Sequence, residues 1–257
     1  MIKLDVLGPL RLRYRGKVIR LQPKQCLVIL ALMCADGPVN SDRLMHLLWD
    51  RPTPGSEKTL RTHISRARKA VIGAGGSGED LIATIELGGG RTVYRLANGL
   101  DIDALRFQQL VAAGCQAFRQ GRIDDASAQL SAALASWQGQ PLAEASGRPF
   151  ALGHVQRLED IYQTAVITQL KAWISLGQHR EAVSELSLLT QRWPGEGEVW
   201  ELLITALYRS DRGAEASNVC RRAIDAMRAE GLDDSLFQQL QRDMLNGLLP
   251  KRGLLAA

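Results

Sequence analysis

The chain has 257 residues, of which 46% are hydrophobic and 23% charged, and its formal net charge at pH 7 is +5. This apolar fraction is ordinary for folded domains, so it excludes a chain that is disordered throughout. No apolar run approaches the roughly 20 residues that span a bilayer, and charges within the first five residues argue against a signal peptide. We therefore expect a soluble cytoplasmic protein with no membrane segment, built from two domains of about 100–200 residues each.

Basic residues are concentrated in the first part of the chain. Residues 1–99 contain 16 Lys and Arg against 8 Asp and Glu, a balance of +8, whereas residues 100–257 contain 16 against 19, a balance of −3. Nucleic acid is a polyanion, and a clustered excess of positive charge is the footprint that a nucleic-acid-binding domain requires. Solvated basic surfaces are also common, so this asymmetry does not decide the function by itself.

The chain opens with a predicted sheet, which is followed by helices. Residues 2–21 alternate apolar and polar side chains between Gly and Pro, which predicts a small antiparallel meander with one buried face. Residues 25–34 are apolar and follow a proline, so they are expected to form a first helix. Ser41 is expected to be the N-cap of a second helix.

The third predicted helix, from a cap at Ser56 to about Ile72, has the most informative pattern. At 100° per residue its apolar residues fall on one narrow stripe. The stripe consists of Leu60, Ile64, Ala67 and Val71. The opposite face carries Lys58, Thr62, Ser65 and Lys69, flanked by Arg61 and Arg66. Arg68 is expected nearer the boundary of the core.

This polar face carries no acid beyond Glu57, so the helix gives up the ion pairs that an ordinary surface helix makes. Arg and Lys can bind guanine edges or phosphates, and Thr or Ser can donate to either, so the face suits the major groove of DNA. The alternative is a merely solvated basic helix, since like-signed surface runs are common.

A hairpin is expected to close the first segment. Apolar runs at 81–85 and 93–96 are joined through a glycine-rich tip that bears Arg91. The glycines of residues 73–78 formally match a dinucleotide-binding pattern, but they follow a helix instead of a strand, so we interpret them as a linker. Strands, three helices and a hairpin are the order of a winged helix-turn-helix with an N-terminal sheet. Arg91 is expected to reach the DNA backbone or the minor groove.

The remainder of the chain is predicted to be almost entirely helical. Similar stretches around Ala182 and Ala216 lie 34 residues apart. This is the period of tetratricopeptide repeats, in which each helix pair buries its face on the next pair. A closing helix is expected over 235–245. The predicted fold class is therefore α+β: a winged helix-turn-helix domain over 1–98 and an all-α, tetratricopeptide-like domain over 99–257.

No arrangement of residues predicts catalysis or a bound metal or cofactor. The four histidines are scattered, the four cysteines are far apart, and no serine lies in a GxSxG motif. We therefore expect no catalytic residue, no metal site and no cofactor, and a protein that is not an enzyme.

Motifs in both segments resemble those of the Streptomyces antibiotic regulatory proteins. They include Leu7 to Leu10, Leu60 to Lys69, Ala133 to Gly139 and Ala206 to Ser210. The resemblance implies an OmpR/PhoB-type DNA-binding domain followed by a bacterial transcriptional activation domain. The chain departs from the family's pattern at Ala67, where leucine is usual, and at Val93, where glycine is usual before the tyrosine of the wing.

The resemblance also implies a function and partners. Proteins of this family are similar to one another in activating secondary-metabolite (antibiotic) gene clusters. The implied partners are double-stranded DNA with direct repeats near promoters, bound by two protomers as a homodimer on DNA, and RNA polymerase holoenzyme. The expected location is the nucleoid within the cytoplasm. The alternative is a tetratricopeptide-type scaffold or modulator that does not read DNA specifically, and the face from Lys58 to Lys69 distinguishes the two hypotheses.

Overall fold

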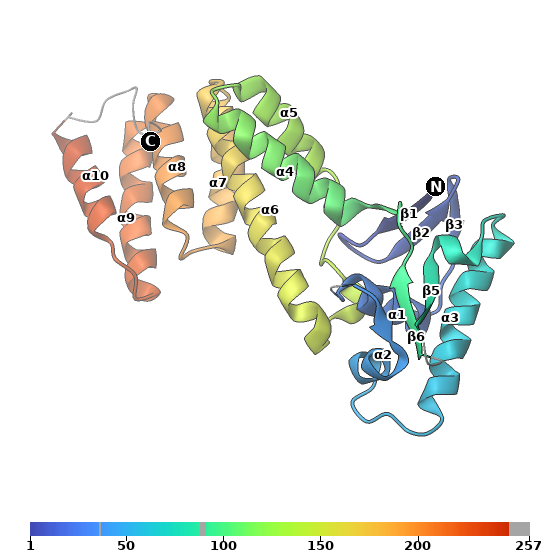
Figure 1. The fold of residues 1–257 in the computed structure, drawn as a ribbon. Coiled ribbons are helices and arrows are strands. Elements are labelled where there is room, and N and C mark those ends of the chain that lie inside the picture. The colour runs from blue at the N-terminus through green and yellow to red at the C-terminus, as the bar shows by residue number, and fades with distance from the viewer. Residues whose placement is uncertain (36, 88–90, 247–257) are drawn as a thin grey trace. The chain divides into compact units, whose positions relative to one another are not determined.

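The computed structural model describes residues 1–35, 37–87 and 91–246 (Figure 1). Their contacts group into two compact units. The first consists of residues 1–110 and 132–162, and the second of residues 111–131 and the chain from 163 onward. This division falls elsewhere along the chain than the expected boundary between residues 98 and 99, which stays a prediction.

The predicted N-terminal meander is confirmed. Strands β1 (Ile2–Asp5), β2 (Arg11–Tyr14) and β3 (Lys17–Ile19) pair antiparallel in sequence order. The turn between β2 and β3 places Gly16 at a φ of +83°, in the left-handed region that favours glycine. The short strand β7 (Asp101–Ile102) pairs parallel with the free edge of β1, which the sequence pattern did not predict.

The winged helix-turn-helix follows in the expected order. Its helices are α1 (Pro23–Met33), α2 (Ser41–Leu48) and α3 (Ser56–Gly73). Its second sheet has the order β4-β6-β5, from β4 (Val39–Asn40), β5 (Ile82–Leu87) and β6 (Arg91–Leu96). A 3-10 turn (Gly78–Asp80) links α3 to β5. All three helices pack against one another, and α1 also contacts β6.

Both helix caps predicted from serines are wrong by one residue. Asn40 precedes α2, and its side-chain oxygen accepts the backbone N–H of Arg43 at 2.8 Å. Gly55 occupies the cap position of α3, and Ser56 is the first helical residue. The buried Ser56 hydroxyl instead accepts the backbone N–H of Thr53 at 2.9 Å, so it fixes the loop that leads into α3.

The remainder of the described chain is helical, as predicted. Its long helices are α4 (Asp103–Arg119), α5 (Ile123–Leu134), α6 (Pro149–Ser175), α7 (His179–Arg192), α8 (Gly197–Arg209), α9 (Gly213–Ala229) and α10 (Ser235–Leu245). A 3-10 turn (Ala143–Ala145) lies between α5 and α6. The starts of α7 and α9 are 34 residues apart, which agrees with the repeat period seen in the sequence.

Successive helices of the second unit share one apolar core. Helix α8 packs on α7 and on α9, and α9 packs on α10. Leu186, Leu203, Cys220 and Phe237 come from these four helices and are buried together. The predicted fold class, a small winged domain with an all-α tetratricopeptide-like domain, is confirmed. Within the described residues, no helix combines the length and the apolar content needed to cross a membrane.

Candidate nucleic-acid interface

Helix α3 is amphipathic in the way that the sequence predicted. The stripe formed by Leu60, Ile64, Ala67 and Val71 is buried, and α3 packs through it against α1 and α2. Burial of these side chains fixes the rotation of the helix about its axis, since turning it would expose apolar surface. The opposite face is therefore held toward solvent.

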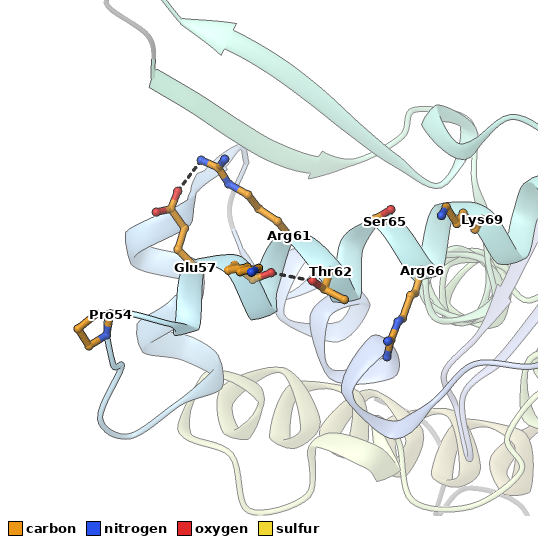
Figure 2. Close-up of a pocket in the computed structure, with 8 residues that line it drawn as sticks. Pro54, Glu57, Arg61, Thr62, Ser65, Arg66 and Lys69 are labelled. Carbon is orange, nitrogen blue, oxygen red and sulfur yellow. Dashed lines mark hydrogen bonds and ion pairs between the residues drawn. The ribbon is translucent and has the colours of Figure 1, made fainter.

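The structure brings six of the seven predicted site residues together on that exposed face. They are Lys58, Arg61, Thr62, Ser65, Arg66 and Lys69, and each is exposed. With Pro54 and Glu57 they line one open hollow along the helix (Figure 2). In this view Arg61 extends toward Glu57, whereas Arg66 extends to the other side of the helix.

Two interactions on this face involve the predicted site residues. An Nη2 proton of Arg61 is donated to Oε1 of Glu57 at 2.6 Å, one helical turn away. The expectation that the helix gives up all its i,i+4 ion pairs is therefore wrong at this position. The Thr62 hydroxyl donates to the carbonyl oxygen of Lys58 at 2.8 Å and keeps its lone pairs free to accept.

Most of the cations on the face have no acidic partner. Within residues 1–35, 37–87 and 91–246, Lys58, Arg66 and Lys69 form no ion pair, so their charges face solvent. Nearby, burial lowers the pKa of His63, and the charges of Arg66 and Lys24 lower it further. The imidazole is therefore neutral at pH 7, and the positive charge of this surface comes from Lys and Arg.

Arg68 connects the helix to the hairpin. Its Nε and Nη2 donate to the carbonyl oxygen of Ile82 at 3.0 and 2.7 Å, and Nη2 also reaches the hydroxyl of Thr84 at 2.6 Å. Glu79 completes the cluster, because it pairs with Arg68 at 3.1 Å and accepts the backbone N–H of Thr84 at 3.0 Å. The expected place of Arg68 at the core boundary is confirmed, but its role in fixing strand β5 was not predicted.

The glycine-rich stretch after α3 serves this junction. A Cβ added to Gly78 would lie 2.7 Å from the Cβ of Arg68, so a larger residue would displace the arginine. The segment is therefore packed against α3, and its interpretation as a mere linker missed that contact. The close approach leaves no signal in the sequence beyond the glycine itself.

The wing is described only in part. Strand β6 begins at Arg91, but the side chain of Arg91 and the tip at 88–90 lie outside the described residues, so its predicted contact stays a prediction. Val93 and Tyr94 are buried, and they pair with Asn40 and Val39 of β4. The Val93 departure from the family's pattern thus falls within a packed strand.

Two families match the chain, one in its N-terminal segment and one in its C-terminal segment. Residues 16–91 match the family described as "Transcriptional regulatory protein, C terminal", and residues 102–242 match the "Bacterial transcriptional activator domain". The regulatory protein DnrI of Streptomyces peucetius is 30% identical over 84% of this chain and 80% of its own length. The chain belongs to the Streptomyces antibiotic regulatory protein family. This family consists of transcriptional regulators.

This family member is also similar to regulatory proteins of mycobacteria. The transcriptional regulatory protein EmbR of Mycobacterium tuberculosis is 32% identical over 86% of this chain. The chain spans only 57% of that protein. A solved structure of EmbR in complex with a low affinity phosphopeptide superposes with a TM-score of 0.85 at 29% identity, covering 97% of this chain and 66% of the other.

Elsewhere in the described residues, the side chains that can carry out chemistry form no metal-binding cluster. In the described parts of the chain, no group of three or more His, Cys, Asp or Glu could hold a metal ion. Burial raises the pKa of Cys26, Cys34 and Cys220 to about 11, so these thiols are protonated at neutral pH. A protonated thiol is a poor nucleophile and a poor metal ligand.

Proposed function

We propose that this family member is a sequence-specific DNA-binding transcriptional activator for a secondary-metabolite gene cluster. The observation that carries the proposal is the exposed face of α3, where Lys58, Arg61, Arg66 and Lys69 surround two short hydroxyl side chains. It reads direct repeats near promoters, recruits RNA polymerase holoenzyme, and works at the nucleoid in the cytoplasm. It has no enzymatic role.

The division of contacts follows from side-chain chemistry. Arg61 and Arg66 can each offer two parallel donors to the O6 and N7 atoms of guanine, and Thr62 or Ser65 can bond either a base or a phosphate. We assign a phosphate contact to Lys69, beyond the central part of the face, and such a contact adds affinity without sequence information. Arg68 holds β5 against α3. The wing that bears Arg91 is therefore presented to DNA together with α3.

The helical repeat domain is assigned to protein partners. Stacked helix pairs present extended surfaces, and repeat domains use them to bind proteins. The second segment, residues 100–257, carries a net charge of −3, which does not favour contact with a polyanion. We assign self-association on DNA and contact with RNA polymerase to this domain.

Two protomers are expected to bind, because one winged helix-turn-helix domain buries little surface and specific binding usually needs a second module. Direct repeats have the same orientation, so the two protomers lie head to tail on them. Inserting five base pairs between the direct repeats turns one site by about half a helical turn, so cooperative binding should be abolished, and ten added base pairs should partly restore it. Binding titrations on the original template and on the templates with five or ten added base pairs measure the cooperativity. Binding that is indifferent to a five-base-pair insertion would refute the arrangement.

A direct binding experiment separates the activator from the alternative scaffold. Fluorescence anisotropy of the full chain with DNA from upstream of neighbouring genes should show specific binding that survives excess competitor DNA. A scaffold that does not read DNA would show only weak, salt-sensitive binding that competitor removes, because such binding depends on phosphate charge alone. Equal affinity for all sequences would therefore reject the proposed function.

A further inference from the structure

Glu57 is an acid on a face otherwise made of cations and hydroxyls. It lies in the first turn of α3, and its side chain is 48% exposed. Its Oε1 lies 2.6 Å from Nη2 of Arg61, and both residues line the same hollow (Figure 2). The ion pair therefore lies within the surface that is proposed to enter the major groove.

Two ordinary roles of an acid at this position are weak. A carboxylate near a helix N-terminus interacts favourably with the helix dipole, and an exposed i,i+4 ion pair adds a little stability. Against these gains, a carboxylate on a DNA-binding surface repels phosphates and lowers affinity for DNA of any sequence. Glu57 therefore weakens the sequence-independent part of DNA binding. Its contact with Arg61 indicates a compensating role in sequence recognition.

The contact leaves Arg61 able to read a base. A guanidinium has five N–H donors in a planar fork, and Glu57 takes one of them. The remaining donors include a parallel pair of the kind that binds O6 and N7 of guanine. A guanidinium already held by a carboxylate loses less rotational freedom when it docks, so more of its hydrogen bonding appears as base discrimination.

We infer that Glu57 is a specificity-determining residue that positions Arg61 against a guanine. This role rests on the proposed DNA-binding function. Glu57 lowers the affinity for non-specific DNA by repulsion and raises the preference for one base pair by orienting Arg61. Specificity of this kind combines an attractive contact with a repulsive one.

The test compares full-length variants on a binding site selected from random DNA, with each base pair of the site changed in turn. Arg61→Ala should remove the preference for guanine at one position. Glu57→Gln keeps the size of the side chain but removes its charge. It should reduce the preference at the same position by about tenfold and strengthen binding to non-specific DNA. The base preferences of the double variant should match those of Arg61→Ala, because residues that act as one unit are not additive.

Asp42→Asn is the matched control. Asp42 is an exposed acid in the first turn of the neighbouring helix α2, so its loss changes the net charge equally but leaves Arg61 untouched. It should leave every base preference unchanged. Circular dichroism of each variant checks that the total helix content is retained.

The outcomes separate the two proposals. A wild-type chain that selects no sequence defeats the proposed function itself. If the wild-type chain selects a site and the Glu57→Gln variant keeps the same base preferences on it, the role of Glu57 alone is overturned. A change at a different base pair that persists in the Arg61→Ala background would show that Glu57 contacts a base directly, which also overturns the positioning role.

Discussion

Replacing Arg61, Thr62, Ser65 and Arg66 together with alanine is expected to abolish specific DNA binding while the protein stays folded. All four side chains are exposed, so their removal opens no cavity in the core. Each good contact to a base contributes about 1–3 kcal/mol of discrimination, so the specific affinity should fall by at least about 100-fold. Anisotropy titrations with the specific site and with unrelated DNA measure both affinities.

Two controls accompany this variant. Lys69→Ala, if it removes a phosphate contact, should weaken binding to all sequences alike. The slope of the logarithm of the binding constant against the logarithm of the salt concentration should then become shallower by about one. Arg119→Ala with Arg180→Ala removes two exposed cations from α4 and α7, and should leave specific binding unchanged. Retention of specific binding by the folded quadruple variant would remove the assignment of α3 as the reading helix.

Asp103→Ala is expected to produce the largest loss of stability among the variants considered. The Asp103 carboxylate is buried and accepts the backbone N–H groups of Val6 and Leu7 at 2.8 and 3.1 Å. Alanine would leave both donors buried and unpaired, so the free energy of unfolding should fall on the order of 2–4 kcal/mol. Urea denaturation followed by circular dichroism measures the change.

Burial of Asp103 disfavours its ionised form. Burial raises the pKa of this carboxyl, and the hydrogen bonds from Val6 and Leu7 oppose that shift only in part. Asp103→Asn keeps one oxygen acceptor, so it should cost less than Asp103→Ala. Asp124→Ala, an exposed acid in the first turn of α5, should change stability by less than about 0.5 kcal/mol. Equal losses for Asp103→Ala and Asp124→Ala would contradict the role of Asp103.

These contacts also bear on the expected domain boundary. Strand β7 pairs with β1, and Glu144 accepts the backbone N–H of Leu10 at 2.9 Å. A fragment that ends at residue 98 lacks Asp103, β7 and Glu144, so it would expose the edge of β1 and leave the donors of Val6, Leu7 and Leu10 without these acceptors. Full-length variants are therefore the appropriate material for testing DNA binding.

Elements in which apolar residues recur at a regular spacing could be predicted from the sequence. The buried stripe of α3 follows from apolar residues recurring every three to four positions, and the bounds of α10 follow from the same pattern. The exposed polar face of α3 was predicted with it, because the two faces of an amphipathic helix imply each other. The repeat period of 34 residues likewise depends on similarity along the chain.

Contacts between residues far apart in sequence could not be predicted. Strand β7 has two residues, too few to show an alternating pattern, and the Asp103 carboxylate meets partners more than 90 residues away. The bond from Arg68 to the carbonyl oxygen of Ile82 involves a backbone acceptor, which every residue possesses and no sequence marks. The caps at Asn40 and Gly55 were missed because a neighbouring serine is as good a cap residue as asparagine and a better one than glycine.

Transcription reconstituted from purified components tests the central claim most directly. The template carries the direct repeats upstream of a promoter, and the protein is added as the full chain with RNA polymerase holoenzyme. Transcript should increase with the wild-type chain, and the increase should be lost both with the Arg61/Thr62/Ser65/Arg66 alanine variant and on a template without the repeats. Activation that is the same with the alanine variant or without the repeats would contradict the account.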